Sequence, residues 1–524
     1  MLTFRPLSQT AKYLLDSLEA KEKTHHEERR ISVNPIVSKF ASWYERLRNS
    51  MELREDEVIL RATVERILKR RLLLGGNGQT TAEPLVKELL WARYLPDHDI
   101  GESVVTKVEE SINVHLSLRL RVLSQHHFPE SVINDWIYDL MSADIQYILN
   151  PKRDKELLTN FMYHVLKDDV KIEDESEETR NAQMFMAVRR AFARDDLAFL
   201  RYHLFSQYFG RLTYKTLDYT VENFPTGYQE LIKQMNYRHK EKIYTYVKRR
   251  TAAFFIFDDI LQGNKENLKT VLETEESLQE VVFEACEKRY RGTRTRVTTA
   301  VIRSVFFILL TKFAFAFAVE GTYERIFLGA IHWNTLAVNI AAPPLLMVIV
   351  SFFIRTPGIN NSKKILEYIN QLLYEEDPKL GNKLLIARPK AADTKFATAF
   401  NILWLVAFGL SFGGMIFILT KFHFNPVSQF IFIFFLAIVS FLSYRISLIA
   451  NIYRVGERQG LLTLLVDFLF MPVIRVGRRL THSIAQINIF LMLFDFFIEA
   501  PFKYLFAFFD QWFYHLHAKT EDLE

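Results

Sequence analysis

The feature that most constrains this chain is a basic segment that leads directly into a long apolar run, at residues 288–319. The run from 305 to 319 is apolar apart from Thr311 and Lys312. The basic residues before it are Lys288, Arg289, Arg291, Arg294, Arg296 and Arg303. A basic flank followed by an apolar run of membrane length is typical of the cytoplasmic entry of a transmembrane helix. We therefore predict a multi-pass membrane protein with a large cytoplasmic region before this point.

Four apolar segments are long enough to cross about 30 Å of hydrocarbon, which takes about 20 helical residues. They are residues 299–319, 333–354, 396–420 and 427–449. The loops 320–325 and 421–426 carry one basic residue each, whereas the segment 355–395 and the tail after Tyr453 carry many. Because basic residues stay on the cytoplasmic side, the N-terminus and 355–395 are predicted to be cytoplasmic. Residues 299–453 would then form a transmembrane domain with four spans and a cytoplasmic helical loop.

The N-terminal half has the apolar spacing of helices. Apolar residues recur at steps of three and four in two stretches: Val105, Val108, Ile112, Leu116, Leu120 and Leu123, then Ile133, Trp136, Ile137, Leu140, Met141 and Ile148. No alternation of apolar and polar residues is long enough to indicate a sheet, so we predict an all-α protein. The acidic segment 168–178 has too few apolar residues to pack. It is predicted to link one helical subdomain, 1–170, to a second, 179–290.

Composition limits the compartment and the partners. Cys286 is the only cysteine, so no intrachain disulfide can form. Residues 1–21 contain no apolar core of a secretory signal peptide. The net charge of +5 is small, and much of the basic excess lies beside apolar runs. This placement indicates membrane topology rather than nucleic-acid binding.

Lys312 is the strongest candidate for a functional side chain. A lysine in the middle of a membrane span costs about 2.5–3.5 kcal/mol on insertion scales, so it is expected to face a polar cavity or a partner. With Asn334, Asn339 and Asn401 it forms our candidate intramembrane polar site. The alternative is that its amine reaches the interface or pairs with Glu320.

The second and third spans carry backbone signals. Pro343 and Pro344 predict a break in the second span, because each proline removes a backbone donor. Gly409 and Gly413 form a pair of small residues that lets a neighbouring helix approach closely.

Two polar stretches are interpreted as helix ends. The run 75–81 superficially resembles a phosphate-binding loop, but it lacks the lysine and follows a helix instead of a strand. We interpret its glycines as the end of that helix. The helix contains Leu60, Val64, Ile67 and Leu68. Asn361 and Ser362 are predicted to cap a cytoplasmic helix with an apolar face. That face contains Ile365, Ile369, Leu372 and Leu373.

The C-terminal region, 454–524, is predicted to be amphipathic and to lie at the membrane interface. Within 484–510, Asp495, Glu499 and Lys503 recur at four-residue steps and form a charged stripe. A crossing helix would carry this stripe through hydrocarbon, whereas a helix lying flat keeps it hydrated. We therefore favour the interfacial placement over a fifth span, and a solvated stripe over an acid–base site.

Three functions fit the sequence. The first is a non-enzymatic, membrane-anchored helical scaffold or partner-binding protein, because the soluble half is large and no catalytic motif is recognisable. The second is a small transporter or channel with a polar path near Lys312. The third is a membrane-embedded enzyme. It is supported only by Asp467, Asp495, Glu499 and scattered histidines.

The expected partners follow from the first hypothesis. They are the lipid bilayer, a protein that binds the N-terminal domain, and a second copy of the chain. Nucleic acid is not expected as a partner, and neither a cofactor nor a metal site is predicted.

Overall fold

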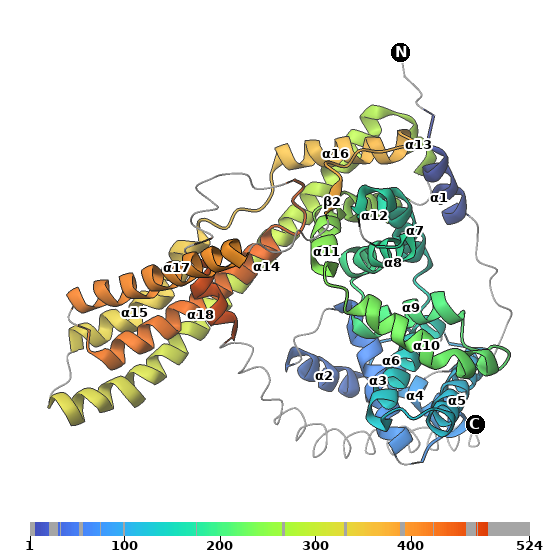
Figure 1. Ribbon diagram of the computed structural model, residues 1–524, viewed down its shortest axis with the longest axis horizontal. Coiled ribbons are helices and arrows are strands. Elements are labelled where there is room, and N and C mark those ends of the chain that lie inside the picture. The colour runs from blue at the N-terminus through green and yellow to red at the C-terminus, as the bar shows by residue number, and fades with distance from the viewer. Residues whose placement is uncertain are drawn as a thin grey trace, which may run out of the picture. The chain divides into compact units, whose positions relative to one another are not determined.

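The computed structural model describes residues 6–19, 30–31, 33–51, 56–73, 75–97, 100–173, 175–264, 268–329, 333–387, 394–422, 424–456, 468 and 470–479. These residues are almost entirely helical, which confirms the predicted all-α class (Figure 1). They form two compact units. The N-terminal unit holds 8–248 and 383–386, and the C-terminal unit holds 249–382 and the described residues from 387 onward.

The described part of the N-terminal unit consists mainly of helices. Its elements are α1 (Gln9–Glu19), α2 (Pro35–Met51), α3 (Asp56–Leu73), α4 (Gly78–Trp91), α5 (Glu102–Gln125), α6 (Glu130–Leu149), α7 (Arg153–Leu166), the 3-10 turn η1 (Lys167–Asp169), β1 (Val170–Ile172), α8 (Glu177–Val188), the π-helix η2 (Arg189–Ala193), α9 (Leu197–Phe209), α10 (Leu217–Met235) and α11 (Lys240–Lys248). A further strand, β2 (Leu384–Ile386), joins this unit from much later in the chain.

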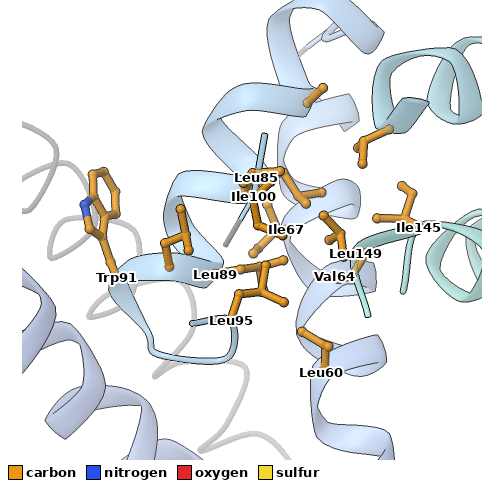
Figure 2. Packing of buried hydrophobic residues seen from close by; sticks show 14 of the residues in the cluster. Leu60, Val64, Ile67, Leu85, Leu89, Trp91, Leu95, Ile100, Ile145 and Leu149 are labelled. Carbon is orange, nitrogen blue, oxygen red and sulfur yellow. The ribbon is translucent and has the colours of Figure 1, made fainter. Parts of the chain in front are cut away.

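One core of this unit lies among α3, α4, α5 and α6 (Figure 2). The helices contribute apolar residues spaced three and four apart, such as Val64 and Ile67 on α3 and Leu85 and Leu89 on α4, all of them buried. Removing each such side chain from water stabilises the fold by about 1.5–3 kcal/mol. The amphipathic pattern therefore decides which face of each helix turns inward.

A second core lies among α5, α6, α9 and α10, so α5 belongs to both. Val108 and Ile112 face the first core, and Leu118 and Val122 face the second. The predicted stripe on α5 is wrong at Leu120, whose side chain is 62% exposed. The reason is that Leu120 is two residues from both Leu118 and Val122, about 160° around the helix, and so lies on the side opposite the buried stripe.

The turn between α3 and α4 has the predicted helix stop. Gly75 has φ +83°, a left-handed backbone that glycine adopts without strain. Asn77 then caps α4, since its side chain accepts a hydrogen bond from the Thr80 amide at 3.0 Å. In return, the Thr80 hydroxyl accepts one from the Asn77 amide at 2.9 Å. This reciprocal capping box satisfies two amides that a helix start leaves without partners.

Strand β1 lies within the segment predicted to be a linker. It pairs in parallel with β2, with Val170 opposite Leu384 and Ile172 opposite Ile386. Val170 is fully buried, and the residues on both sides of the segment belong to one compact unit. The local sequence lacks apolar residues, but β2 supplies the partner from a distant part of the chain.

The C-terminal unit is built on one long helix. Its elements are α12 (Thr251–Gly263), α13 (Leu268–Glu273), α14 (Glu275–Phe315), the π-helices η3 (Ala316–Gly321) and η4 (Glu324–Leu328), α15 (Trp333–Ser351), α16 (Ile359–Tyr374), α17 (Thr394–Lys421) and α18 (Pro426–Ala450). With 41 residues, α14 is about 62 Å long at 1.5 Å per residue.

The first half of α14 is part of a soluble-looking helical cluster. Leu278, Val282 and Cys286 are buried there, where α14 packs against α12, α13 and α16. The helix continues into its apolar half because it contains no proline and only one glycine, Gly292. The segment 299–319, predicted as a separate span, is therefore the far part of a longer helix and of η3.

Among the residues that the structure describes, three helices are long and apolar enough to span a membrane: Glu275–Phe327, Asn401–Lys421 and Pro426–Ala450. Helices α17 and α18 begin and end close to the predicted spans 396–420 and 427–449. The predicted span 333–354 corresponds to α15, whose apolar part, Leu336–Ser351, is shorter.

The predicted break at Pro343 and Pro344 is wrong, because α15 stays helical through both residues. The fixed φ of proline matches a helix, so each proline costs a hydrogen bond without ending the helix. Apolar spanning helices tolerate such losses where neighbouring groups satisfy the backbone.

The apolar helices α14, α15 and α18 share one core, which includes Ile308, Met347 and Phe435. Helix α17 packs on α18. Residues 470–479 are also helical and lie against both, since Arg475 covers the Trp404 ring at 4.3 Å. Gly477 approaches α18 so closely that an added Cβ would lie 2.0 Å from the Ala437 carbonyl oxygen.

Candidate functional site

Lys312 forms a fully buried ion pair with Glu320. The Lys312 Nζ lies 2.6 Å from Glu320 Oε1, and both side chains are 0% exposed. The ammonium also lies 5.2 Å from the centre of the Phe435 ring on α18. The structure thus contains the pairing with Glu320 that the sequence left as an alternative.

Two more polar side chains complete the site around Glu320. The second carboxylate oxygen, Oε2, accepts hydrogen bonds from the Asn339 amide on α15 and from the Ser428 hydroxyl on α18, the latter at 3.3 Å. Asn339 and Ser428 are buried. Asn339 Oδ1 has no hydrogen-bond partner within the described part of the chain. We call Lys312, Glu320, Asn339 and Ser428 the glutamate site.

The glutamate site draws on four elements: α14, η3, α15 and α18. Residues eight apart are about 12 Å apart along a regular α-helix, too far for the usual i,i+4 pair. The change from α-helix to π-helix at Ala316 alters the direction in which Glu320 points. Such π-helical turns are frequent at functional sites.

One backbone carbonyl next to the site also lacks its usual hydrogen-bond donor. Pro343 has no amide hydrogen, so the carbonyl of Asn339 has no intrahelical donor at the i+4 position. Asn339 therefore has a side-chain oxygen without a described partner beside Glu320, and a backbone carbonyl that lacks the usual helical donor.

A second buried carboxylate lies one turn further along. Glu324 in η4 is 2% exposed and accepts a hydrogen bond from the Asn425 side chain at 2.9 Å. Asn425 also caps α18 by accepting from the Ser428 amide at 2.8 Å. The start of α18 is thus joined to both carboxylates of the π-helical segment.

The other predicted site residues do not join this cluster. Asn334 and Asn401 are exposed. Gly409 and Gly413 are also exposed, and a Cβ added to either would meet nothing within 4 Å. No described helix therefore lies against the two glycines, and their role in helix packing stays a prediction. Asp467 and the charged stripe of Asp495, Glu499 and Lys503 lie outside the described residues.

Asn361 has a different role from the predicted cap. Helix α16 begins at Ile359 with Gly358 before it, and the Asn361 amide donates to the Tyr290 hydroxyl and the Tyr453 carbonyl, both at 2.7 Å. Its Oδ1 accepts from the Val455 amide at 2.8 Å. The predicted apolar face of α16 is confirmed, because Ile365, Ile369, Leu372 and Leu373 are buried.

We call Tyr290, Asn361 and Tyr453 the asparagine junction. Tyr290 precedes the apolar half of α14, Asn361 follows α15, and Tyr453 follows α18. The three points therefore lie at the same end of the apolar helices. The glutamate site lies much further along α14 and α18.

The N-terminal unit contains a buried arginine that the sequence analysis missed. Arg189 is 1% exposed and donates to both oxygens of Glu156, each at 2.8 Å, and to the Tyr147 hydroxyl at 2.9 Å. It also pairs with Asp195. The Tyr147 hydroxyl lies 2.9 Å from His203 Nε2. This cluster connects α6, α7, η2 and α9.

Burial and charge shift the pKa values in this cluster. Burial alone would raise the pKa of Glu156, but the hydrogen bonds and charge of Arg189 outweigh it and lower that pKa to about 2. Burial lowers the pKa of His203 well below its usual range, and the nearby Arg189 cation adds to the effect. A cavity of about 30 Å³ beside the cluster has room for one or two water molecules. The cluster is therefore better suited to joining helices than to holding a substrate.

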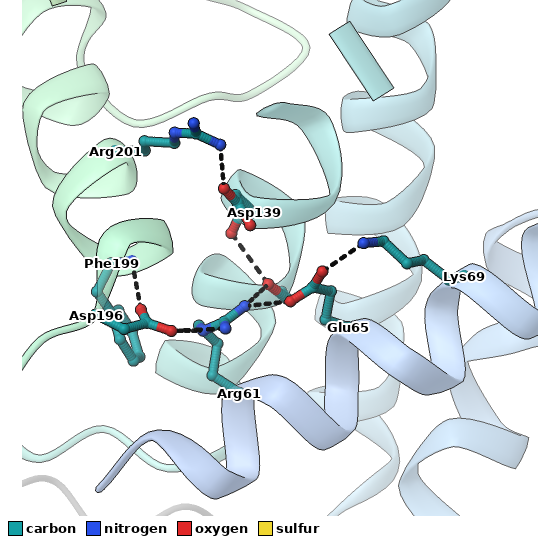
Figure 3. A network of polar contacts seen from close by, with 8 residues as sticks. Arg61, Glu65, Lys69, Asp139, Asp196, Phe199 and Arg201 are labelled. Carbon is teal, nitrogen blue, oxygen red and sulfur yellow. Dashed lines mark hydrogen bonds and ion pairs between the residues drawn. The ribbon is translucent and has the colours of Figure 1, made fainter. Parts of the chain in front are cut away.

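A related network connects α3, α6 and α9 (Figure 3). Arg61 pairs with Asp196 at 2.6 Å and with Glu65 at 2.7 Å, and Glu65 also binds Lys69. Burial raises the pKa of Glu65, but hydrogen bonds from Lys69 and Arg61 outweigh it, so the pKa lies below its usual value. Asp196 additionally caps α9 by accepting from the Phe199 amide at 3.0 Å.

Ser111, His115 and Asp144 lie close together but are not arranged for nucleophilic catalysis. The Ser111 hydroxyl donates to Asp144 at 2.7 Å and lies 3.5 Å from His115 Nδ1. That nitrogen lies closer, at 2.7 Å, to the Ser111 carbonyl oxygen, to which it can only donate. A catalytic serine needs its hydroxyl on the histidine that removes its proton. All three residues are buried, so they stabilise the contact between α5 and α6.

The sequence could have pointed to some of these sites. Lys312 and Glu320 stand out as charges in or beside an apolar run, so the sequence indicates Glu320 as a partner for Lys312. Arg189 and Asp195 occur in a mixed charged stretch that looks like any solvated helix face. Nothing in their spacing distinguishes a buried arginine from an exposed one.

No metal centre is apparent in the ranges that the structure describes, where no three histidine, cysteine, aspartate or glutamate side chains gather. Comparison with known proteins finds no matching family model, no matching curated protein and no matching solved structure.

Proposed function

We propose that this protein is a non-enzymatic, multi-pass membrane scaffold that holds its helical N-terminal unit at the cytoplasmic face of a bilayer, where the unit binds a protein partner. The pairing of β1 with β2 carries the proposal. Strand β2 comes from the segment between α16 and α17, yet it completes a strand pair in the N-terminal unit. A domain on a flexible tether has one chain connection to the rest of the protein. The N-terminal unit has three: the chain before α12 and the chain on each side of β2.

The proposed topology rests on the asparagine junction and on β2. The junction brings the start of the apolar part of α14, the end of α15 and the end of α18 to one end of the helices. Strand β2 requires the segment 383–386 to be on the same side as the N-terminal unit. The basic residues in these segments support a cytoplasmic assignment.

Helix α15 is proposed as a fourth span. Its 19 residues reach about 28 Å, close to the thickness of the hydrocarbon core. It packs against both α14 and α18, which are long enough to cross. A helix between two spanning helices shares their environment, so α15 belongs in the same layer.

Labelling of introduced cysteines tests the topology. Arg325→Cys and Phe422→Cys place thiols on exposed positions at the far end of the helices, whereas Lys364→Cys places one beside the asparagine junction. An impermeant maleimide should label the first two in intact cells and the third only after permeabilisation. The native Cys286 is buried and provides the background. The reverse labelling pattern would show that the orientation is inverted.

Cross-linking in cells tests the scaffold. A tagged full-length chain should cross-link through its N-terminal unit to a defined protein. Leu385→Pro removes a backbone donor and strains the extended strand, and should reduce that cross-link. Leu385 is 60% exposed, so Leu385→Ala preserves the backbone and is the matched control. If no protein cross-links to residues 8–248, the scaffold proposal fails.

A second candidate function is ion or solute transport through the glutamate site. The observation that favours it is a lysine and a carboxylate inside the apolar helices, joined by one hydrogen bond over which a proton can move. Reconstituted vesicles with an internal pH dye would report proton flux. Lys312→Met should abolish the flux, whereas Asn401→Ala at an exposed position should not. Flux equal to that of protein-free vesicles would exclude proton transport.

A further inference from the structure

We propose that the apolar helices carry a basic belt at the end where the asparagine junction lies, and that this belt binds the headgroups of anionic phospholipids. The belt consists of Arg294, Arg296, Arg303, Arg355, Lys363, Lys364 and Arg445. The inference rests on the proposed function, because it requires α14 and α18 to cross a bilayer.

The first observation is that the segments of the belt contain no acids. No aspartate or glutamate occurs in 288–319, 325–366 or 394–456. The seven belt residues are distributed over these three segments. Around the five arginines of the belt, neighbours along the chain therefore cannot neutralise the positive charge. Lys363 and Lys364 have Glu367 four and three residues further along α16.

The second observation is that tertiary structure does not neutralise it either. All seven belt side chains are exposed, and none forms an ion pair with a carboxylate in the described ranges. Two adjacent cations behave differently: Arg289 pairs with Asp259, and Arg291 pairs with Glu287 at 2.6 Å. The belt residues are thus exposed cations without counter-charges in the described part of the protein.

The third observation is the level of the belt along the helices. Helices α14 and α18 are antiparallel: Lys312 meets Phe435, Phe315 meets Phe434, and Glu320 meets Ser428. The same register places Arg303 level with Arg445. Two exposed arginines on different helices thus lie at one depth.

That depth matches the boundary between headgroups and hydrocarbon. With Lys312 at the middle of its span, as the sequence predicts, Arg303 lies nine residues away, which is about 13 Å along the helix and close to half of a 30 Å core. Beside it, Ile302 and Phe306 are 63% and 66% exposed. Phe352 and Phe353 are exposed just before Arg355. Long basic side chains next to exposed apolar ones extend toward phosphates while their stems stay in the acyl region.

Anionic lipid is the occupant that these observations favour. Phosphate groups of lipids lie at the depth of Arg303 and Arg445, and their negative charge complements the exposed arginines and lysines of the belt. Each basic residue near an anionic membrane surface contributes about 1 kcal/mol of attraction. A soluble polyanion such as RNA would have to displace headgroups from the apolar residues beside the belt.

The test compares the full-length protein in lipid nanodiscs. The measured quantity is the association constant of spin-labelled phosphatidylglycerol relative to that of spin-labelled phosphatidylcholine. Arg303→Gln with Arg445→Gln should lower this ratio by about fivefold for each arginine removed, which is about 1 kcal/mol each. The matched control is Arg325→Gln in η4 with Lys421→Gln in α17, two exposed cations at the opposite end of the apolar helices. The control should leave the ratio unchanged.

Three outcomes would overturn the proposal. The first is an unchanged ratio in the Arg303 and Arg445 variant, and the second is an equal loss in the far-end control. The third is displacement of the labelled lipid by inorganic phosphate or RNA, which would indicate a general anion site. Both variants should unfold at the wild-type temperature in phosphatidylcholine, which shows that folding is intact. Failure of the wild-type chain to enter any bilayer would instead contradict the proposed function.

Discussion

Glu320 is the residue on which the apolar half of this protein depends most. Removing a carboxylate and an ammonium from water costs several kcal/mol per ion, and good geometry with further hydrogen bonds is needed to offset it. Glu320 has such geometry, with donors from Lys312, Asn339 and Ser428. The pair is therefore stable only as a unit.

The first prediction is that breaking this pair costs more than deleting it. Lys312→Met leaves an uncompensated buried carboxylate and should lower the free energy of unfolding by about 3–5 kcal/mol. Lys312→Met combined with Glu320→Gln should recover most of that loss, because neither residue is then charged. Denaturant titration of the wild type, Lys312→Met, Glu320→Gln and the double variant in detergent gives the coupling energy. A neutral Lys312→Met, or additive single effects, would mean that the pair does not exist.

The second prediction concerns the buried histidines of the N-terminal unit. Burial lowers the pKa values of His115 and His203 below the unfolded value of about 6.5. As the pH falls below about 6.5, the unfolded chain takes up protons that the folded chain excludes. Stability should therefore fall with acidification, by roughly 1 kcal/mol per pH unit for each histidine.

Unfolding free energies measured between about pH 7.5 and about pH 5.5 test this sign. His203→Gln should reduce the pH dependence, because glutamine does not titrate. Glu156 does not interfere, since its stabilising effect is lost only as the pH falls from about 4.5 toward its folded-state pKa of about 2. A pH dependence that stays the same in His203→Gln would show that this histidine is protonated in the folded state.

At the scale of elements, close helix contacts decide whether replacing a glycine stabilises or destabilises the fold. An added Cβ at Gly227 in α10 would lie 2.2 Å from Cζ of Phe209. A Cβ at Gly292 in α14 would meet nothing within 4 Å. The two glycines occupy similar positions inside helices, so the sequence alone does not distinguish them.

The third prediction uses this contrast. Gly292→Ala should raise the free energy of unfolding by up to about 1 kcal/mol, the usual gain in a helix interior. Gly227→Ala should lower it by about 1–3 kcal/mol, because the clash with Phe209 exceeds that gain. Thermal unfolding of both variants provides the measurement. Stabilisation by Gly227→Ala would mean that α9 and α10 are less closely packed than described.

At the scale of the whole molecule, the boundary between the two units decides which fragments fold. Helix α12 and the first half of α14 belong to the C-terminal unit, where they pack against α16. Phe254, Phe257 and Val282 are fully buried there. A fragment that includes these residues without α16 exposes their apolar faces.

The fourth prediction follows from that boundary. Residues 1–248 expressed alone should be soluble and helical, losing only the short pair of β1 with β2. Residues 1–287 should aggregate or need detergent, because exposed apolar faces drive association. Circular dichroism and size-exclusion chromatography compare the two fragments. A monomeric, detergent-free fragment ending at residue 287 would place the boundary at the start of the apolar half of α14.

The amino-acid sequence by itself determined the helical class, the positions of α17 and α18, the apolar face of α16 and the helix stop at Gly75. These follow from apolar periodicity, run length and glycine conformation, which act over a few neighbouring residues. The same reasoning singled out Lys312 and suggested Glu320 as a partner, because charge in an apolar run is conspicuous.

Only the tertiary structure decided which distant groups meet. Strand β2 pairs with β1, Asn361 joins Tyr290 to Tyr453, and Asn339 and Ser428 complete the site around Glu320. It also decided that Arg189 is buried while similar arginines are exposed. The physical reason is that a hydrogen bond or ion pair depends on distances of about 3 Å between atoms. Local spacing along the chain does not encode such distances between segments that are far apart.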